Sequence, residues 1–255
     1  MAEVFPVEEG VEGWVTPGFI DVHCHGGGGA SFPDDPSAEG VDKAVEAHRS
    51  FGTTALIAST VSLIDTLTPI KGLAQACEEG KLVGIHLEGP YISPAKCGAQ
   101  NPAAIRMPDL DELRGWLEAG KGWIKTMTIA PEVDNAIEAA QLLLDYGAVP
   151  SWGHTSADEE QTRAVIEATS AYAAKIGFAK PPQMATHLFN AMPPLGHRAP
   201  GPVRELMAAA RRGEAVVELV ADTVHVHPDL VADVVTFIQR AVSYTHLTLP
   251  TTPYV

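Results

Sequence analysis

The stretch Leu82–Pro94, LVGIHLEGPYISP, decides how the rest of the chain is interpreted. Its apolar residues predict a buried strand of a parallel sheet. Gly89 and Pro90 follow directly and cannot continue a strand, so we expect Glu88 at the carboxyl end. A single glutamate there is most often a solvated residue. In a protein of alternating strands and helices, however, this end of a strand is where functional side chains gather.

Strand patterns and amphipathic helix patterns alternate on both sides of this stretch. The expected strands are Phe19–Val22, Thr53–Thr60, Leu82–Glu88, Trp123–Glu132, one ending at His154, one ending at His187 and one preceding His225. The expected helices are Val41–Phe51, Leu63–Glu79, Leu110–Ala119, Asn135–Tyr146, Ala157–Ala174, Val203–Arg212 and Leu230–Ala241. Seven such units predict an α/β fold, a (β/α)8-type barrel truncated by about one unit, because a closed barrel needs eight.

Composition narrows the class of protein. The chain has 255 residues, 45% of them hydrophobic, which is enough for one sizeable core. Its net charge of −15 argues against nucleic acid or an anionic membrane surface as a partner. The three cysteines are too few and too widely spaced for a disulfide framework. The acidic N-terminus lacks the features of a signal peptide, and no apolar run could cross a bilayer, so we expect a cytoplasmic protein.

Metal-ligating residue types recur at the ends of the expected strands. They are His23 and His25 on the first strand, Glu88 on the third, His154 on the fifth and His187 on the sixth. Side chains alternate along a strand, so His23 and His25 share one face. Catalytic zinc sites use about three such ligands and leave a position for water, which the metal ionises near neutral pH. The set therefore predicts a divalent metal site.

Other residues of the same types have plainer interpretations. His48, His197, His227 and His246 are taken as ordinary hydrogen-bonded polar residues. Cys24 faces away from His23 and His25, which indicates packing and not metal binding. Gly26–Gly29 lack the spacing of a nucleotide-binding loop and predict a flexible loop that other parts of the chain approach closely.

Six sequence blocks, in this order, resemble the N-acetylglucosamine-6-phosphate deacetylases of the amidohydrolase superfamily. The blocks are PGFIDVHCHGGGG, GIHLEGPYISPAKCGAQNP, TIAPE, GHTSA, THLFNAMPPLGHRAPG and ELVADTVHV. The resemblance runs from about Thr16 to Val242. THLFNAM and HLEGP together are specific, whereas His-x-His alone is shared across the superfamily.

The resemblance implies roles for particular residues. Glu88, His154 and His187 match the principal metal ligands, and His23 and His25 match a pair that binds a second ion in some members. One or two divalent ions are therefore expected, zinc first, with iron, manganese or cobalt as alternatives. The residues that match substrate contacts are Asn190, Ala191 and Arg198 for the sugar phosphate, His225 for the amide carbonyl and charge developing there, and Gln100 for a sugar hydroxyl, where the family usually has histidine.

The implied reaction removes the acetyl group from N-acetylglucosamine 6-phosphate, giving glucosamine 6-phosphate and acetate in amino-sugar catabolism. Compared with the family, residues 1–15 correspond to a remnant of an N-terminal β-sandwich, 16–242 to an incomplete barrel, and 243–255 to a poorly ordered or foreign tail. The family's general base is an aspartate after the eighth strand, and 243–255 contains no Asp or Glu. We therefore expect a fragment that binds metal but turns over little.

Two other functions stay open. One is a different amidohydrolase, such as a dihydroorotase or a deaminase. The other is a non-catalytic protein that binds a sugar phosphate. The resemblance also implies a homodimer for the intact family member.

Overall fold

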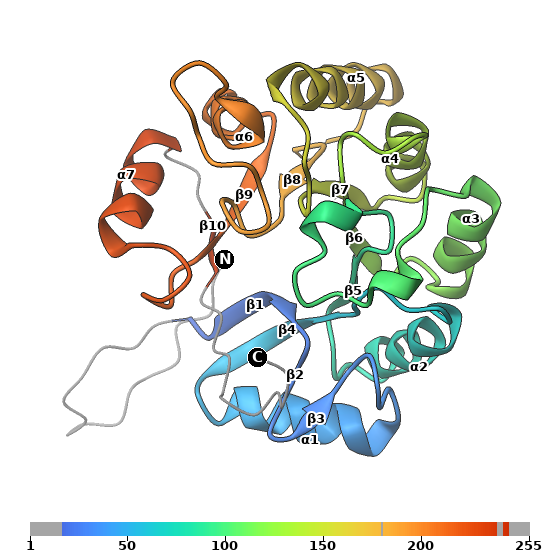
Figure 1. The fold of residues 1–255 in the computed structure, drawn as a ribbon. Coiled ribbons are helices and arrows are strands. Elements are labelled where there is room, and N and C mark those ends of the chain that lie inside the picture. Colours follow the sequence, from blue (N-terminus) through green and yellow to red (C-terminus); the bar gives the residue numbers. More distant parts are fainter. Residues whose placement is uncertain (1–16, 180, 239–241, 245–255) are drawn as a thin grey trace.

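The computed structural model describes residues 17–179, 181–238 and 242–244 (Figure 1). Eight strands form one parallel sheet in the order β1-β4-β5-β6-β7-β8-β9-β10. Helices α1 to α7 lie around the outside of this curled sheet (Figure 1). The barrel-type α/β fold expected from the sequence is therefore confirmed. No helix in the described part of the chain is long and apolar enough to cross a membrane.

The elements have the following bounds. The strands are β1 (Phe19–Cys24), β2 (Gly26–Gly27), β3 (Ala30–Ser31), β4 (Thr53–Ser59), β5 (Gly84–Glu88), β6 (Ile124–Ile129), β7 (Val149–Trp152), β8 (Met184–Ala185), β9 (Val216–Val220) and β10 (Val242–Tyr244). The helices are α1 (Ala38–Arg49), α2 (Leu67–Glu78), α3 (Leu110–Ala119), α4 (Ala136–Asp145), α5 (Glu159–Ile176), α6 (Gly201–Arg212) and α7 (Pro228–Ile238).

The seven expected strand–helix units are all present. The structure adds a short eighth strand, β10, at the point where the sequence analysis ended the barrel and placed a poorly ordered or foreign tail. Val242 pairs with Glu218 and Tyr244 with Val220, in parallel register. Pairing needs only an extended backbone beside β9, so the low apolar density of this segment did not prevent it. The segments 1–15 and 245–255 lie outside the described residues.

Helix ends carry the signals that fix them. Asp158 and Gln161 form a capping box at the start of α5, in which each side chain binds the other's backbone N–H. The helix ends at Gly177, whose φ of +70° suits a residue without Cβ. Asp109 accepts two backbone N–H bonds at the start of α3. These caps set where each helix begins relative to the strand before it.

The strands have one apolar and one polar face. Their outward residues pack against the helices and include Leu56, Ala58, Ile85, Leu87, Met127, Ile129, Trp152, Ala185, Val217 and Leu219. The alternating residues are buried and polar, and include Ser59, His86, Thr128, Ser151, Thr186 and Glu218. The apolar residues of Leu82–Glu88 predicted a buried strand, and β5 is buried, but the face of the strands that lines the barrel interior is largely polar.

A chain of hydrogen bonds satisfies these interior groups. Ser59 Oγ lies 3.0 Å from His86 Nδ1, and His86 Nε2 lies 2.8 Å from Thr128 Oγ1. Thr128 Oγ1 lies 2.7 Å from Thr186 Oγ1, which contacts Ser151 Oγ at 2.6 Å. The chain joins five adjacent strands or their ends, from β4 to β8, across the barrel. Because buried polar groups are costly when unpaired, this chain constrains how the strands close.

The glycine-rich segment forms a small hairpin. Gly26 and Gly27 pair antiparallel with Ser31 and Ala30. A Cβ on Gly27 would lie only 2.8 Å from Nε2 of His48 on α1, so the close approach expected of this loop is confirmed. His48 is buried and lies 2.9 Å from the Gly26 carbonyl oxygen, as its assignment to a polar structural role predicts.

We expect the interior chain to contribute to stability. Thr128→Val leaves the His86 Nε2 and Thr186 groups without their partner, at a cost of about 1–3 kcal/mol in the free energy of unfolding. Thr54→Val, on the exposed face of β4, is the matched control and should change it by less than about 0.5 kcal/mol. Urea unfolding of the three proteins measures both values. Equal midpoints for the two variants would contradict this role.

Candidate metal centre

Glu88 is the last residue of β5, and its side chain is buried. Gly89 and Pro90 end the strand there, as expected. His154 and His187 each follow a strand end by two residues, after β7 and β8. Both have left-handed backbone conformations, with φ of +46° and +30°, which non-glycine residues seldom adopt. Strained backbone of this kind is concentrated at functional sites.

One group forms around a single oxygen of Glu88. His154 Nε2 lies 3.2 Å and His187 Nε2 lies 3.0 Å from Glu88 Oε1. The two imidazole nitrogens are 3.0 Å apart. Residues from β5 and from the loops after β7 and β8 therefore converge at one point.

A second group shares the same carboxylate. His25 Nε2 lies 3.2 Å from Glu88 Oε2, and His23 Nε2 lies 3.5 Å from Glu88 Oε1. His23 and His25 come within 3.1 Å of one another through their Nε2 atoms. In each group, one possible ligand atom per residue lies within 4.8 Å of the others. Glu88 thus lies between two sets of imidazoles.

The hydrogen bonds on the outer side of two rings orient their lone pairs inward. His154 Nδ1 lies 2.8 Å from the Lys96 carbonyl oxygen, which can only accept, so this nitrogen carries the proton. In the neutral ring the Nε2 of His154 then presents a lone pair to Glu88. His23 Nδ1 faces the carboxylate of Glu218 at 3.1 Å, so in the neutral ring Nδ1 carries the proton and Nε2 presents the lone pair. Lone pairs that face a carboxylate repel it unless a cation lies between, so the donor set fits a divalent ion.

The electrostatics of the site favour positive charge. Burial alone lowers the pKa of His23, but Glu88 and Glu218 outweigh it and raise that pKa to about 10. Burial also opposes ionisation of Glu88, yet His23, His154 and His187 hold the pKa of this carboxyl well below its usual range. For His187 burial prevails, and its pKa is lowered. An environment that stabilises a proton on His23 also stabilises a metal cation.

Two buried residues near the site were missed from the sequence. Glu218, in the middle of β9, contacts His23. The ring of His86 lies 4.5 Å from the His23 ring. Burial, followed by the charge of His23, lowers the pKa of His86 well below its usual value, so it stays neutral within the interior chain. The sequence signal that could have found them is a polar residue between apolar neighbours in a strand: Glu218 in VVELV and His86 in GIHLE.

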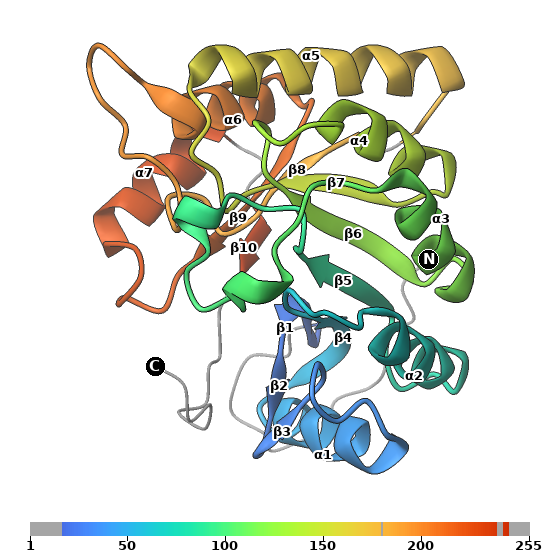
Figure 2. The same ribbon diagram turned by 45° about the vertical axis from the view of Figure 1, so that its right-hand side comes forward.

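Gln100 lies on the long loop between β5 and α3, which contains the 3₁₀ turns Pro94–Lys96 and Pro102–Ala104. This loop, green in Figures 1 and 2, lies inside the ring of helices in Figure 1. The Gln100 Nε2 donates to Glu88 Oε2 at 2.6 Å, and its Oε1 accepts from the Ser62 N–H at 2.5 Å. Both ends of the amide therefore have protein partners, one of them the central carboxylate.

The expected substrate contacts lie in two further loops. Asn190 and Ala191 come shortly after His187, and the Ala191 carbonyl accepts from the Thr155 N–H at 3.0 Å. Arg198, farther along this loop, is exposed. His225 is also exposed, and its Nδ1 pairs with Asp222 in the loop after β9. The structure thus brings the five expected ligands together, whereas Arg198 and His225 face solvent.

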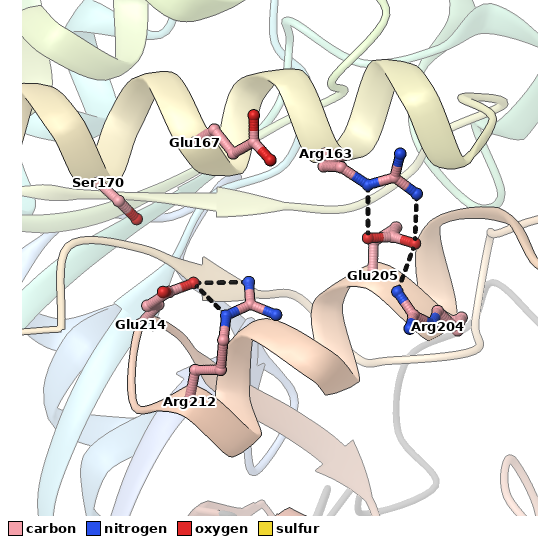
Figure 3. Close-up of a pocket in the computed structure, with 7 residues that line it drawn as sticks. All are labelled: Arg163, Glu167, Ser170, Arg204, Glu205, Arg212 and Glu214. Carbon is pink, nitrogen blue, oxygen red and sulfur yellow. Dashed lines mark hydrogen bonds and ion pairs between the residues drawn. The ribbon is translucent and has the colours of Figure 1, made fainter.

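A separate cavity of about 380 Å³ lies on the outside of the barrel, between α5 and α6 (Figure 3). Its arginines already have partners, since Arg163 and Arg204 pair with Glu205 and Arg212 pairs with Glu214. This cavity is lined by none of the residues of the Glu88 groups and is not the candidate site.

Both known sequences and known structures resemble this chain. N-acetylglucosamine-6-phosphate deacetylase of Bacillus subtilis is 36% identical over 223 residues, which are 84% of this chain and 52% of that protein. N-acetylgalactosamine-6-phosphate deacetylase of a Shewanella species is 34% identical, over 85% and 52%. N-acetyl-D-glucosamine-6-phosphate deacetylase of Mycobacterium smegmatis has a TM-score of 0.80 at 39% identity, over 89% of this chain and 57% of that structure. The chain spans about half the length of the curated relatives that it matches.

The family model named Amidohydrolase family matches residues 14–249. This match includes all the strands and helices described above, and continues beyond residue 242, where the sequence analysis placed the end of the barrel. Over this range the metal-ligand residue types converge at the strand ends. The chain therefore belongs to the amidohydrolase family.

Proposed function

We propose that this chain carries the metal centre and sugar-phosphate site of an N-acetylglucosamine-6-phosphate deacetylase, in a catalytic domain of residues 16–242. The observation that carries the proposal is the single buried carboxylate of Glu88 placed between two pairs of histidines. The names of the relatives support the substrate class. A location in the cytoplasm and a homodimer complete the proposal.

The residues would divide the work as follows. Glu88, His154 and His187 hold a first divalent ion, and His23 and His25 hold a second with the same glutamate. A bound ion supplies Lewis acidity, which makes water a nucleophile near neutral pH. Zinc suits this set of imidazole and carboxylate donors, although iron, manganese and cobalt accept the same ligands. The burial of Glu88 keeps this charge in a medium of low dielectric, where electrostatic effects are strong.

The substrate would be held at the strand ends by the loops. Arg198 offers the planar, bidentate donor set that suits a phosphate, and its exposure leaves these donors accessible. Asn190 and Ala191 lie between His187 and Arg198 in the sequence, so one sugar phosphate would reach from the proposed ligand His187 to Arg198. His225 would contact the amide carbonyl and stabilise negative charge there. Gln100 would reach a sugar hydroxyl only by giving up a contact with Glu88 or Ser62.

A second candidate substrate has a specific basis. Two relatives of similar identity are named N-acetylgalactosamine-6-phosphate deacetylases, and their substrate differs from the first at one hydroxyl. A dihydroorotase or deaminase activity would have less use for Arg198. A non-catalytic sugar-phosphate-binding protein would keep Arg198 and the pocket without turnover.

We expect Glu88→Gln combined with His154→Ala to remove at least one ion per chain, because two of the three donors of the first group are lost, one of them the carboxylate shared with the second group. Elemental analysis of the purified, dialysed chain measures the number of metal ions per chain. His227→Ala changes an exposed histidine outside both groups and should leave this number unchanged. Equal metal content in all three proteins would refute the site.

Arg198→Ala should weaken binding of glucosamine 6-phosphate about 10- to 100-fold, because a charge-assisted hydrogen bond is worth about 1.5–3 kcal/mol. Calorimetric titration of the metal-loaded chain measures the dissociation constant. Arg114→Ala, at an exposed site on α3, is the control. Tighter binding of galactosamine 6-phosphate would favour the second substrate, and binding of dihydroorotate alone would exclude both.

Turnover by the 255-residue chain should be slow. The family resemblance implies an aspartate after the eighth strand as the general base, and residues 243–255 contain no acidic side chain that could take its place. Loss of a general base costs on the order of 10²–10⁴-fold. Acetate release should therefore lag behind that of the Bacillus subtilis relative by about this factor, at equal metal loading. Rates that agree within a few-fold would show that another group accepts the proton.

A further inference from the structure

Glu218 is a buried carboxylate that the proposed function does not use. It lies in β9 between Val217 and Leu219, which pack against the helices, so its side chain enters the polar interior. It is fully buried, with 0% of its surface exposed. Burying a carboxylate costs several kcal/mol unless its oxygens are well paired. A glutamate at this position therefore calls for a compensating interaction.

The contacts of Glu218 connect the two histidine groups. Its Oε2 lies 3.1 Å from His23 Nδ1, and the same oxygen accepts the backbone N–H of His187 at 3.2 Å. The β8–β9 pairing places these groups side by side, and the Leu188 N–H also donates to the Glu218 carbonyl. Among the described residues, the buried Oε1 atom has no hydrogen-bond partner.

The contact with His23 fixes which nitrogen of that ring faces Glu88. An ionised carboxylate only accepts hydrogen bonds, so the His23 Nδ1 carries a proton. In the neutral ring Nε2 is then unprotonated and presents a lone pair. The Nε2 atom is the one that lies 3.5 Å from Glu88 and 3.1 Å from His25. Carboxylates that orient metal-ligating histidines in this way act on metal affinity without touching the ion.

We infer that Glu218 is a positioning residue, which holds the His23 ring with Nε2 toward the His23–His25–Glu88 group and so sets the affinity of that group for a second divalent ion. The inference rests on the proposed function, since it assumes that this group binds an ion. It assigns no such effect to the His154–His187 side, where Glu218 contacts only the backbone of His187 and the Lys96 carbonyl orients the His154 ring.

Zinc titration of the metal-free chain against a chromophoric chelator tests the inference. The wild type should bind two ions. Glu218→Leu removes the acceptor and should weaken the second ion about 10- to 100-fold while the first is retained. Glu218→Gln keeps an acceptor for His23 Nδ1–H and should restore most of that affinity. His23→Ala should lose the second ion.

Thr126→Val is the control for a change in the polar interior, because Thr126 Oγ1 is buried without a hydrogen-bond partner among the described residues. It should bind both ions as the wild type does. A second ion bound equally tightly by Glu218→Leu would overturn the inference. So would a wild type that binds a single ion, which removes the second ion from the proposed function but leaves its first site and its substrate class intact. Absence of any bound ion would instead refute the proposed function itself.

A measurement on the wild type covers the case in which Glu218→Leu does not fold. Nitrogen-15 spectra of the zinc-loaded chain distinguish the ring nitrogen of each histidine that carries a proton from the one that does not. We expect a proton on Nδ1 of His23. A His23 ring protonated on Nε2 alone would overturn the inference.

Discussion

The contact between the Glu88 carboxylate and four imidazole Nε2 atoms is the constraint on which the rest of this structure depends. Oxygen–nitrogen distances of 3.0–3.5 Å join five residues from four places in the barrel. Four positively charged imidazoles would repel one another, so positive charge alone would not hold these rings around one buried carboxylate. The strand ends must therefore meet within a narrow tolerance, and the helices, caps and loops serve to bring them there.

The two faces of the strands explain how that tolerance is reached. Outward residues such as Leu87 and Leu219 supply the apolar area that packs against the helices. Inward residues such as His86 and Thr128 form directional hydrogen bonds, which admit fewer arrangements than apolar contacts do. The outward face of the strands thus supplies most of the stability. The inward face fixes the geometry beneath the candidate metal centre. Glu218 belongs to this inner layer and contacts His23, one of the proposed ligands.

The loop after β5 connects the centre to the surface. Its Lys96 carbonyl orients His154, and its Gln100 side chain donates to Glu88. Movement of this loop would change the contacts of two proposed ligands at once. The position of this loop and the contacts of Glu88 and His154 are therefore physically coupled, through a segment that is longer than most connections between a strand and a helix.

The sequence by itself determined the seven strand–helix units and the convergence of His23, His25, Glu88, His154 and His187. Both follow from local rules, namely the alternation of side chains along a strand and the common direction of parallel strands. The tertiary structure alone decided the strand β10, the polar interior and the partners of Gln100. It also decided the contact of Glu218 with His23, 195 positions away. Such contacts depend on how the sheet curls, and no short sequence window contains both partners.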